Sequence, residues 1–260
     1  MNVSRVHPRE DQVAELTRGQ RLPLPPLHEL HLILIAKVLR RAWNDLLPDR
    51  RAILLSGEET EVNTLIETRL NALLEEEGPW SLLVRDVARG KETVSYDGSH
   101  LEKRPDLSIH LTDRSPSFPL IVECKVIDAR SKKKINLYCN DGVVRFVRGE
   151  YGWATREAFM LAYVRDGSTI SSCLIPFLSE SRTQLQDIYL TDSLPESIGE
   201  PDIVLARSSH NREFRYLGQS NSRPGTIALW HLWIAADPHY QDQGASTPIA
   251  TCPVAANPQK

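Results

Sequence analysis

Apolar residues recur at helical spacing in the first third of the chain. The spacing predicts a helix from Glu58 to Glu77, with Ser56 as a possible N-cap, because its apolar positions fall on one side: Val62, Leu65, Ile66, Leu70, Leu73 and Leu74. An earlier apolar stretch predicts a helix over 28–47 that stops before Pro48, since a proline disfavours helical backbone in the preceding residue. The polar and Pro-rich residues 1–27 are expected to form an extended arm.

After Gly78 the pattern changes to short apolar runs that are typical of strands. Strands are expected over 80–88, over 93–96 (pairing back on the first), and over 107–111, 120–127, 203–206 and 226–235. A short helix is expected near 140–147, whereas residues 158–164 fit a helix or a strand equally well, and residues 237–260 predict a disordered tail. The order predicts an α/β protein with a mixed central sheet flanked by helices, in a single domain over 28–236.

Composition and charge exclude a few classes of protein. The chain has 260 residues, of which 41% are hydrophobic, and a net charge of −3, so it can bury a core and is neither a uniformly basic binder nor an acidic disordered chain. The charge is unevenly distributed, with a local net of −6 over 58–77, +5 over 125–148 and +3 over 204–225. Such a distribution is compatible with a metal-loaded cleft that attracts a polyanion.

Several motifs are missing from the sequence. The four cysteines form no CxxC pair, which argues against a zinc knuckle, a thioredoxin-type motif or an obvious disulfide framework. No phosphate-binding loop, dinucleotide fingerprint or nucleophile elbow is present. The longest strongly apolar run, from Leu30 to Leu39, is too short to cross a bilayer. We therefore expect a soluble, cytoplasmic protein that does not associate with membranes.

The residues that carry chemistry lie in two of the expected strands. Asp106 opens the strand over 107–111, and Glu123 and Lys125 lie two apart in the next strand, so they point to the same face while Cys124 points to the other. If the strands are neighbours, two carboxylates and the backbone carbonyl of Cys124 can hold Mg²⁺ or Mn²⁺ through oxygen. Lys125 can then assist an attacking water. The alternative is a solvated Glu–Lys pair, but charges inside so apolar a run are costly to bury without partners.

The segments Pro105-Asp106 and Glu123-Cys124-Lys125 resemble the motif of the PD-(D/E)xK nuclease superfamily. The resemblance implies a restriction-endonuclease-like core over about 58–164, with the order helix, three antiparallel strands, helix and a further strand. It also implies a glutamate from the first core helix. Helical phase favours Glu59 over Glu58 and Glu61 for that role, although acidic residues also favour helix N-termini through the helix dipole alone.

Four residues are candidates for contacts with nucleic acid. Arg145 and Arg148 are three apart in an expected helix, so they share one helix face. They bind phosphate, or they pair with the carboxylates, or they are ordinary surface arginines. His210 and Arg212 are expected in a polar loop. His231, in an aromatic-rich strand, fits a hydrogen-bonded core residue better than a functional one.

These features predict a Mg²⁺-dependent endonuclease that acts on DNA, with RNA as the other possible substrate, in a bacterial antiviral defence or restriction-like role. The alternative is a catalytically inactive nuclease-fold module that binds nucleic acid or a partner protein. The resemblance also implies a homodimer or larger assembly.

Overall fold

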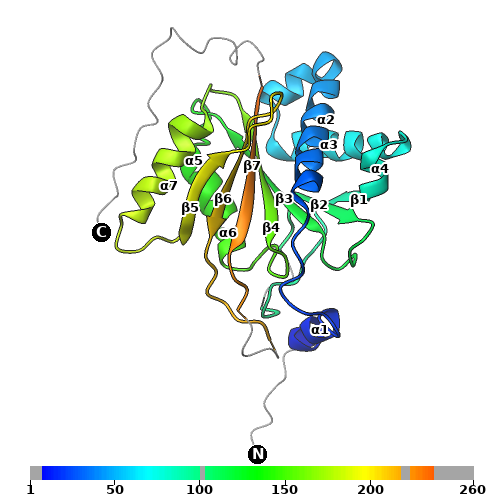
Figure 1. The fold of residues 1–260 in the computed structure, drawn as a ribbon. Helices are drawn as coiled ribbons and strands as arrows, with labels where there is room; N and C mark the ends of the chain where they lie inside the picture. Colours follow the sequence, from blue (N-terminus) through cyan, green and yellow to red (C-terminus); the bar gives the residue numbers. More distant parts are fainter. Residues whose placement is uncertain (1–7, 100–102, 218–222, 237–260) are drawn as a thin grey trace, which may run out of the picture.

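A computed structural model describes residues 8–99, 103–217 and 223–236. Its centre is a seven-stranded mixed sheet with the strand order β1-β2-β3-β4-β7-β6-β5 (Figure 1). The strands are β1 (Val84–Arg89), β2 (Leu107–Leu111), β3 (Leu120–Ile127), β4 (Glu157–Val164), β5 (Thr191–Ser197), β6 (Leu205–His210) and β7 (Ile227–Ala235). The expected α/β class, with a mixed sheet flanked by helices, is confirmed.

The sheet is antiparallel at both ends and parallel in the middle. β1, β2 and β3 form an antiparallel meander, β3, β4 and β7 run parallel, and β6 and β5 close the sheet with antiparallel pairs. Parallel neighbours need a crossover, and the chain from β3 to β4 supplies one through a helical run of α5 (Ile135–Tyr138), η2 (Cys139–Val143) and α6 (Val144–Val147). The short helix expected near 140–147 therefore exists and begins five residues earlier.

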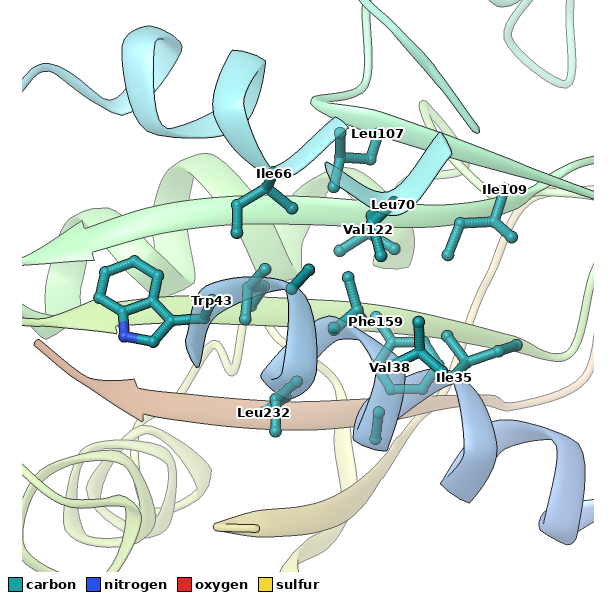
Figure 2. Close-up of a cluster of buried hydrophobic side chains, with 14 of the residues drawn as sticks. Ile35, Val38, Trp43, Ile66, Leu70, Leu107, Ile109, Val122, Phe159 and Leu232 are labelled. Carbon is teal, nitrogen blue, oxygen red and sulfur yellow. The ribbon is translucent and has the colours of Figure 1, made fainter. Parts of the chain in front are cut away.

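Two long helices cover one face of the sheet. α2 (Glu29–Ser56) and α3 (Glu59–Ala72) lie beside each other over the central strands (Figure 1). Figure 2 shows how Trp43 from α2 and Ile66 from α3 project toward Val122, Phe159 and other strand side chains. All four are almost fully buried in one hydrophobic cluster, which fixes α3 above β3 and so sets the position of its N-terminal residues.

The opposite face is covered by the α5–α6 run, η3 (Ile170–Leu174) and α7 (Ile175–Arg182), which pack on a second hydrophobic cluster. Since both faces are buried, the central strands carry nearly continuous apolar runs, and all eight residues of β4 are buried. This explains why residues 158–164 showed no alternation by which a strand could be told from a helix.

The helix boundaries differ from the expected ones in two places. α2 does not stop before Pro48 but reaches Ser56, with a break in helical geometry at Arg50. α3 is capped by Glu58 rather than by Ser56, because the Glu61 side chain accepts the backbone N–H of Glu58 at 2.8 Å in a capping box. A short 3₁₀ turn, η1 (Leu73–Glu75), follows α3.

Two expectations about strands were wrong. Residues 80–88 are not one strand, since α4 (Pro79–Leu83) precedes β1. Residues 93–96 do not pair with β1; instead Thr93 forms an isolated bridge with Lys103. α7 and β5 were not foreseen, because half of the α7 residues and most of the β5 residues are polar and neither sequence has a clear period.

The N-terminal segment is not simply an extended arm. It contains α1 (Pro8–Leu16), and the chain after α1 packs on the rest of the protein. Val13, Leu22 and Leu24 are buried in a third cluster with Phe118 and Trp153. Residues 1–7 and the predicted tail over 237–260 lie outside the described residues.

Two further findings concern the membrane and the cysteines. Among the helices of residues 8–99, 103–217 and 223–236, none combines the length and the apolar character needed to cross a bilayer. Cys124 and Cys139 are buried free thiols, but Cys173 is disulfide-bonded.

Candidate active site

The candidate site forms where β3 extends beyond its shorter neighbour β2. The β2–β3 pairing includes Leu107 opposite Val122 and goes no further along β3. The next backbone N–H groups on that edge, those of Cys124 and Val126, would lack strand partners. They donate instead to carboxylates, Cys124 to Asp106 Oδ2 at 2.8 Å and Val126 to Glu59 Oε2 at 3.0 Å. The uneven strand lengths therefore position two acidic side chains at one place.

The ammonium group of Lys125 lies among four oxygen atoms. Its Nζ is 2.7 Å from Glu123 Oε1 and 2.8 Å from the backbone oxygen of Cys124. It is also 3.5 Å from Glu59 Oε1 and 3.6 Å from Asp106 Oδ2. The strands are neighbours, and all the residues expected to form the site surround one point. The Cys124 carbonyl, expected to face a metal, accepts a hydrogen bond from Lys125.

Glu123 is the most buried of these acids, with only 1% of its surface exposed. Its Oε1 accepts hydrogen bonds from both Lys125 and Arg145, the latter at 3.0 Å. Its Oε2 is buried and has no hydrogen-bond partner among the described residues. Burial raises the pKa of Glu123 to about 8, although the charges of Lys125 and Arg145 oppose that shift.

The two cations respond to the same carboxylates. Burial disfavours the charged form of Lys125, but Glu123, Asp106 and Glu59 together raise its pKa above the ordinary value. Burial also disfavours the charged form of Arg145, but Glu123, Tyr151 and Glu150 together raise its pKa. Its guanidinium donates to the Tyr151 hydroxyl at 2.9 Å and lies over that ring. Of the alternatives for Arg145, the structure therefore shows the ion pair with the carboxylate site.

Asn63 and Tyr163 support the site from behind and were missed in the sequence. Asn63 Nδ2 donates to Asp106 Oδ1 at 3.0 Å, and its Oδ1 accepts from the Tyr163 hydroxyl at 2.8 Å. Asn63 is 1% exposed and lies one helical turn after Glu59, on the same face of α3. The available signal was an amide among the apolar positions Val62, Ile66 and Leu70 of α3.

Two of the expected nucleic-acid contacts are buried inside the protein. His210 is not in a loop but ends β6, fully buried, where its Nδ1 lies 2.8 Å from the Tyr189 backbone oxygen. The Arg212 guanidinium is 6% exposed and donates to four backbone oxygens, those of Gly152, Trp153, Pro224 and Gly225. Both residues hold the fold together, so the prediction that they contact nucleic acid was wrong.

Other candidates also found structural partners. His231 is fully buried and lies between Tyr138 and Ser208, as a core histidine does. Glu58 pairs with Lys133 at 3.0 Å. Arg148 is exposed and lines a polar groove, so its contact with phosphate stays a prediction. Of the three acids at the start of α3, Glu59 alone contacts Lys125 within the described residues.

A basic hairpin follows β3 directly. Asp128 and Lys133 form an isolated bridge that closes a loop with the sequence Ala-Arg-Ser-Lys. Lys133 of this hairpin pairs with Glu58, which directly precedes Glu59 in the chain. The hairpin therefore lies next to the start of α3 and to the carboxylates. Positive charge thus flanks the acidic site, as the sequence pattern suggested.

The donor atoms can be compared with those that a divalent cation needs. Mg²⁺ and Mn²⁺ prefer carboxylate and carbonyl oxygens, which Asp106, Glu123, Glu59 and the Cys124 carbonyl supply. The unpaired Glu123 Oε2 is a further buried oxygen that a cation would satisfy. In the described part of the chain, however, no three His, Cys, Asp or Glu side chains are arranged to hold a metal ion. The residue types therefore fit a hard divalent cation. In the structure, the ammonium group of Lys125 is the positive charge that lies between these carboxylates.

Comparison with known proteins adds no family to this picture. No family model matches the chain, and neither a curated protein nor a solved structure matches it at a significant level.

Proposed function

We propose that this protein is a metal-dependent nuclease that hydrolyses phosphodiester bonds in DNA. The observation that carries the proposal is the convergence of Asp106, Glu123 and Glu59 on Lys125, at the end of a strand and beside a basic hairpin. Buried charges of this kind are costly to keep without partners or a ligand, and Oε2 of Glu123 has no partner in the described part of the chain.

The order of the elements supports the same proposal. α3 is followed by the antiparallel meander β1–β2–β3, the helical run α5–α6 and the parallel strand β4. That is the order implied by the resemblance of Asp106 and Glu123-Cys124-Lys125 to the nuclease motif. The homodimer and the cytoplasmic location stay predictions.

Each residue has a distinct part in the proposed reaction. Asp106, Glu123 and Glu59 would hold the divalent cation, which when bound polarises a phosphoryl oxygen and lowers the pKa of water. Lys125 orients the attacking water and offsets the negative charge that develops on the phosphoryl group. Arg145 keeps Oε1 of Glu123 occupied, and so directs Oε2 toward the ligand.

The test is a cleavage assay of plasmid, linear duplex and single-stranded DNA and of RNA, with Mg²⁺, Mn²⁺ or EDTA. We expect cleavage with either metal, none with EDTA, and a loss of at least about 100-fold in Asp106→Asn and Lys125→Met, the scale of removing one stabilising group. Asp113→Asn, an exposed acid in the β2–β3 turn, is the matched control and should cleave normally.

Two results would contradict the proposal: normal cleavage by folded Asp106→Asn, or no cleavage of any substrate by the wild-type protein with either metal. The second result would favour a nuclease-fold module without catalysis, in which Lys125 permanently holds the position of a cation.

A further inference from the structure

A second pocket lies on the same face of the sheet as Glu123. Ile121 precedes Glu123 by two residues on β3, so both side chains point to one face, about 7 Å apart along the strand. Ile121 lines a cavity of about 340 Å³, and Ser108, its partner on β2, lines the same cavity. The cavity thus begins one step along the strand from the candidate active site.

Part of the wall of this pocket is apolar and aromatic, and the charged residues Lys91, Glu92 and Glu150 line it as well. Phe118 and Trp153 line it and pack edge to face with ring centroids 5.6 Å apart. Leu16 of the N-terminal helix α1 adds to the apolar lining, and so does Val94 from the loop after β1. A cavity of this size and character is typical of a site for a small planar ligand.

Two buried polar atoms in this region have no partner. The side chains of Ser108 and His110 are 1% and 4% exposed, and both line the pocket. Neither Ser108 Oγ nor His110 Nε2 has a hydrogen-bond partner among the described residues. They do not bond each other either, which argues against a serine nucleophile activated by this histidine. Two unpaired groups on one strand, side by side on one face, suit a single ligand that bonds both.

The neighbour of His110 determines what this ligand must offer. Asp86 Oδ1 lies 2.6 Å from His110 Nδ1, directly across the β1–β2 pair. Because a carboxylate accepts hydrogen bonds, Nδ1 carries the hydrogen, and Nε2 of the neutral ring is an acceptor. The ligand must therefore bring an N–H or O–H donor to His110 and a second polar atom to the Ser108 hydroxyl.

We infer that this pocket binds a nucleobase. A base is planar, has apolar faces for the Phe118 and Trp153 side, and carries ring N–H or amino donors beside acceptors on one edge. The inference deepens the proposed function and rests on it. A base held in this pocket would bring the phosphodiester next to it in the strand close to Glu123. The base would then have to leave its stack, as enzymes that read single bases require.

The experiment measures binding without catalysis. The full-length protein in EDTA is titrated calorimetrically with each nucleoside up to millimolar concentration, and in a second arm with short single-stranded DNA. Ser108→Ala removes one hydrogen bond and should weaken nucleoside binding about fivefold. Ser197→Ala, an exposed serine on β5 that does not line this pocket, is the matched control and should change the affinity by less than about twofold.

The two arms distinguish the source of the base. Binding of both nucleosides and single strands, each weakened in Ser108→Ala, supports a pocket for a base within nucleic acid. Binding of nucleosides alone supports a pocket for a free base or nucleoside. Absence of any nucleoside or strand binding overturns the inference, and so does binding that Ser108→Ala leaves unchanged while circular dichroism shows a native fold.

Failure here is distinguishable from failure of the proposed function. Binding in EDTA does not require hydrolysis, so a protein that binds bases but never cleaves refutes the nuclease proposal alone. A protein that cleaves with Mg²⁺ but shows no effect of Ser108→Ala on nucleoside binding refutes the pocket alone.

Discussion

Two clusters of buried polar groups lie on the same sheet, and they differ in charge and in completeness. The first is the candidate site around Lys125, which is charged and has the unpaired oxygen of Glu123. The second joins Tyr138, His231, Ser208 and His210, beneath the helices that pack on the same sheet face as Glu123. Every distance in this second chain lies between 2.7 and 2.8 Å.

The histidine cluster can be satisfied without any charge. His210 donates from Nδ1 to the Tyr189 backbone oxygen, so its Nε2 accepts from the Ser208 hydroxyl. Ser208 then accepts from His231 Nε2–H, and His231 Nδ1 accepts from the Tyr138 hydroxyl. One direction of donation runs through the whole chain, and no donor or acceptor in it is left over.

The difference separates groups that stabilise the fold from groups that act on a ligand. A neutral network with all its bonds made gains nothing from a partner, so His210 and His231 are structural. A charged cluster that lacks one partner is incomplete without a ligand. Residue type alone gave the opposite ranking for His210, because histidine near arginine suggests phosphate binding.

The largest expected effect would come from acid acting on the histidine cluster. Burial lowers the pKa of His210 to about 4, and burial together with His210 lowers that of His231 to about 3. Below pH of about 6.5 the unfolded chain binds protons that the folded protein does not, so each histidine removes about 1.4 kcal/mol of stability per pH unit down to its folded pKa. Buried carboxylates with raised pKa, such as Glu123 and Glu157, act in the opposite sense.

A comparison of variants isolates the histidine contribution. Between pH 6.5 and pH 4.5, the free energy of unfolding of His231→Gln should fall by about 1.4 kcal/mol per pH unit less than that of the wild type, because the variant lacks one buried histidine. The carboxylates are common to both proteins, so their contribution cancels in the difference. Urea denaturation at several pH values measures this difference, with His31→Gln on α2 as the control. Equal pH slopes in wild type and His231→Gln would mean that the cluster is not neutral.

A smaller effect is expected from the supporting layer of the charged cluster. Asn63→Ala removes the amide that holds Asp106, and we expect cleavage to fall about 10- to 100-fold while Asp106 itself remains. Asn71→Ala is the matched control, since it lies on the same helix and bonds the backbone of Val87 in β1 instead. If both variants lose activity equally, loss of stability explains the effect and Asn63 has no positioning role.

The smallest effect should come from the basic hairpin. Lys133→Gln removes one positive charge beside Glu58 and should weaken DNA binding uniformly across sequences, with the salt dependence reduced by about one unit of slope. Fluorescence anisotropy at several salt concentrations, in EDTA, measures both quantities. Lys37→Gln on α2, paired with Glu200, is the control. An unchanged salt slope in Lys133→Gln would place the nucleic acid elsewhere.

The sequence predicted the charged cluster better than the neutral one, for physical reasons. Glu123 and Lys125 interrupt an apolar strand, and helical phase selected Glu59, so local periodicity carried the information. Asn63 and Tyr163 are joined across 100 positions, and no local pattern reveals such a contact. His210 was misplaced because β6 has a polar sequence, and its burial depends on the helices packed over it rather than on its neighbours in the chain.

The overhang of β3 past β2 makes the geometry of the candidate site depend on the turn that joins these two strands. Residues 112–119 determine how far β2 runs along β3, and so which backbone N–H groups remain for Asp106 and Glu59. A slip of one residue would exchange the two faces of the strand, and a slip of two would keep the faces while moving Asp106 away from Cys124. The length of this turn is therefore constrained by the candidate site as well as by the sheet, because a change that preserved the sheet would still move Asp106 and Glu59 relative to β3.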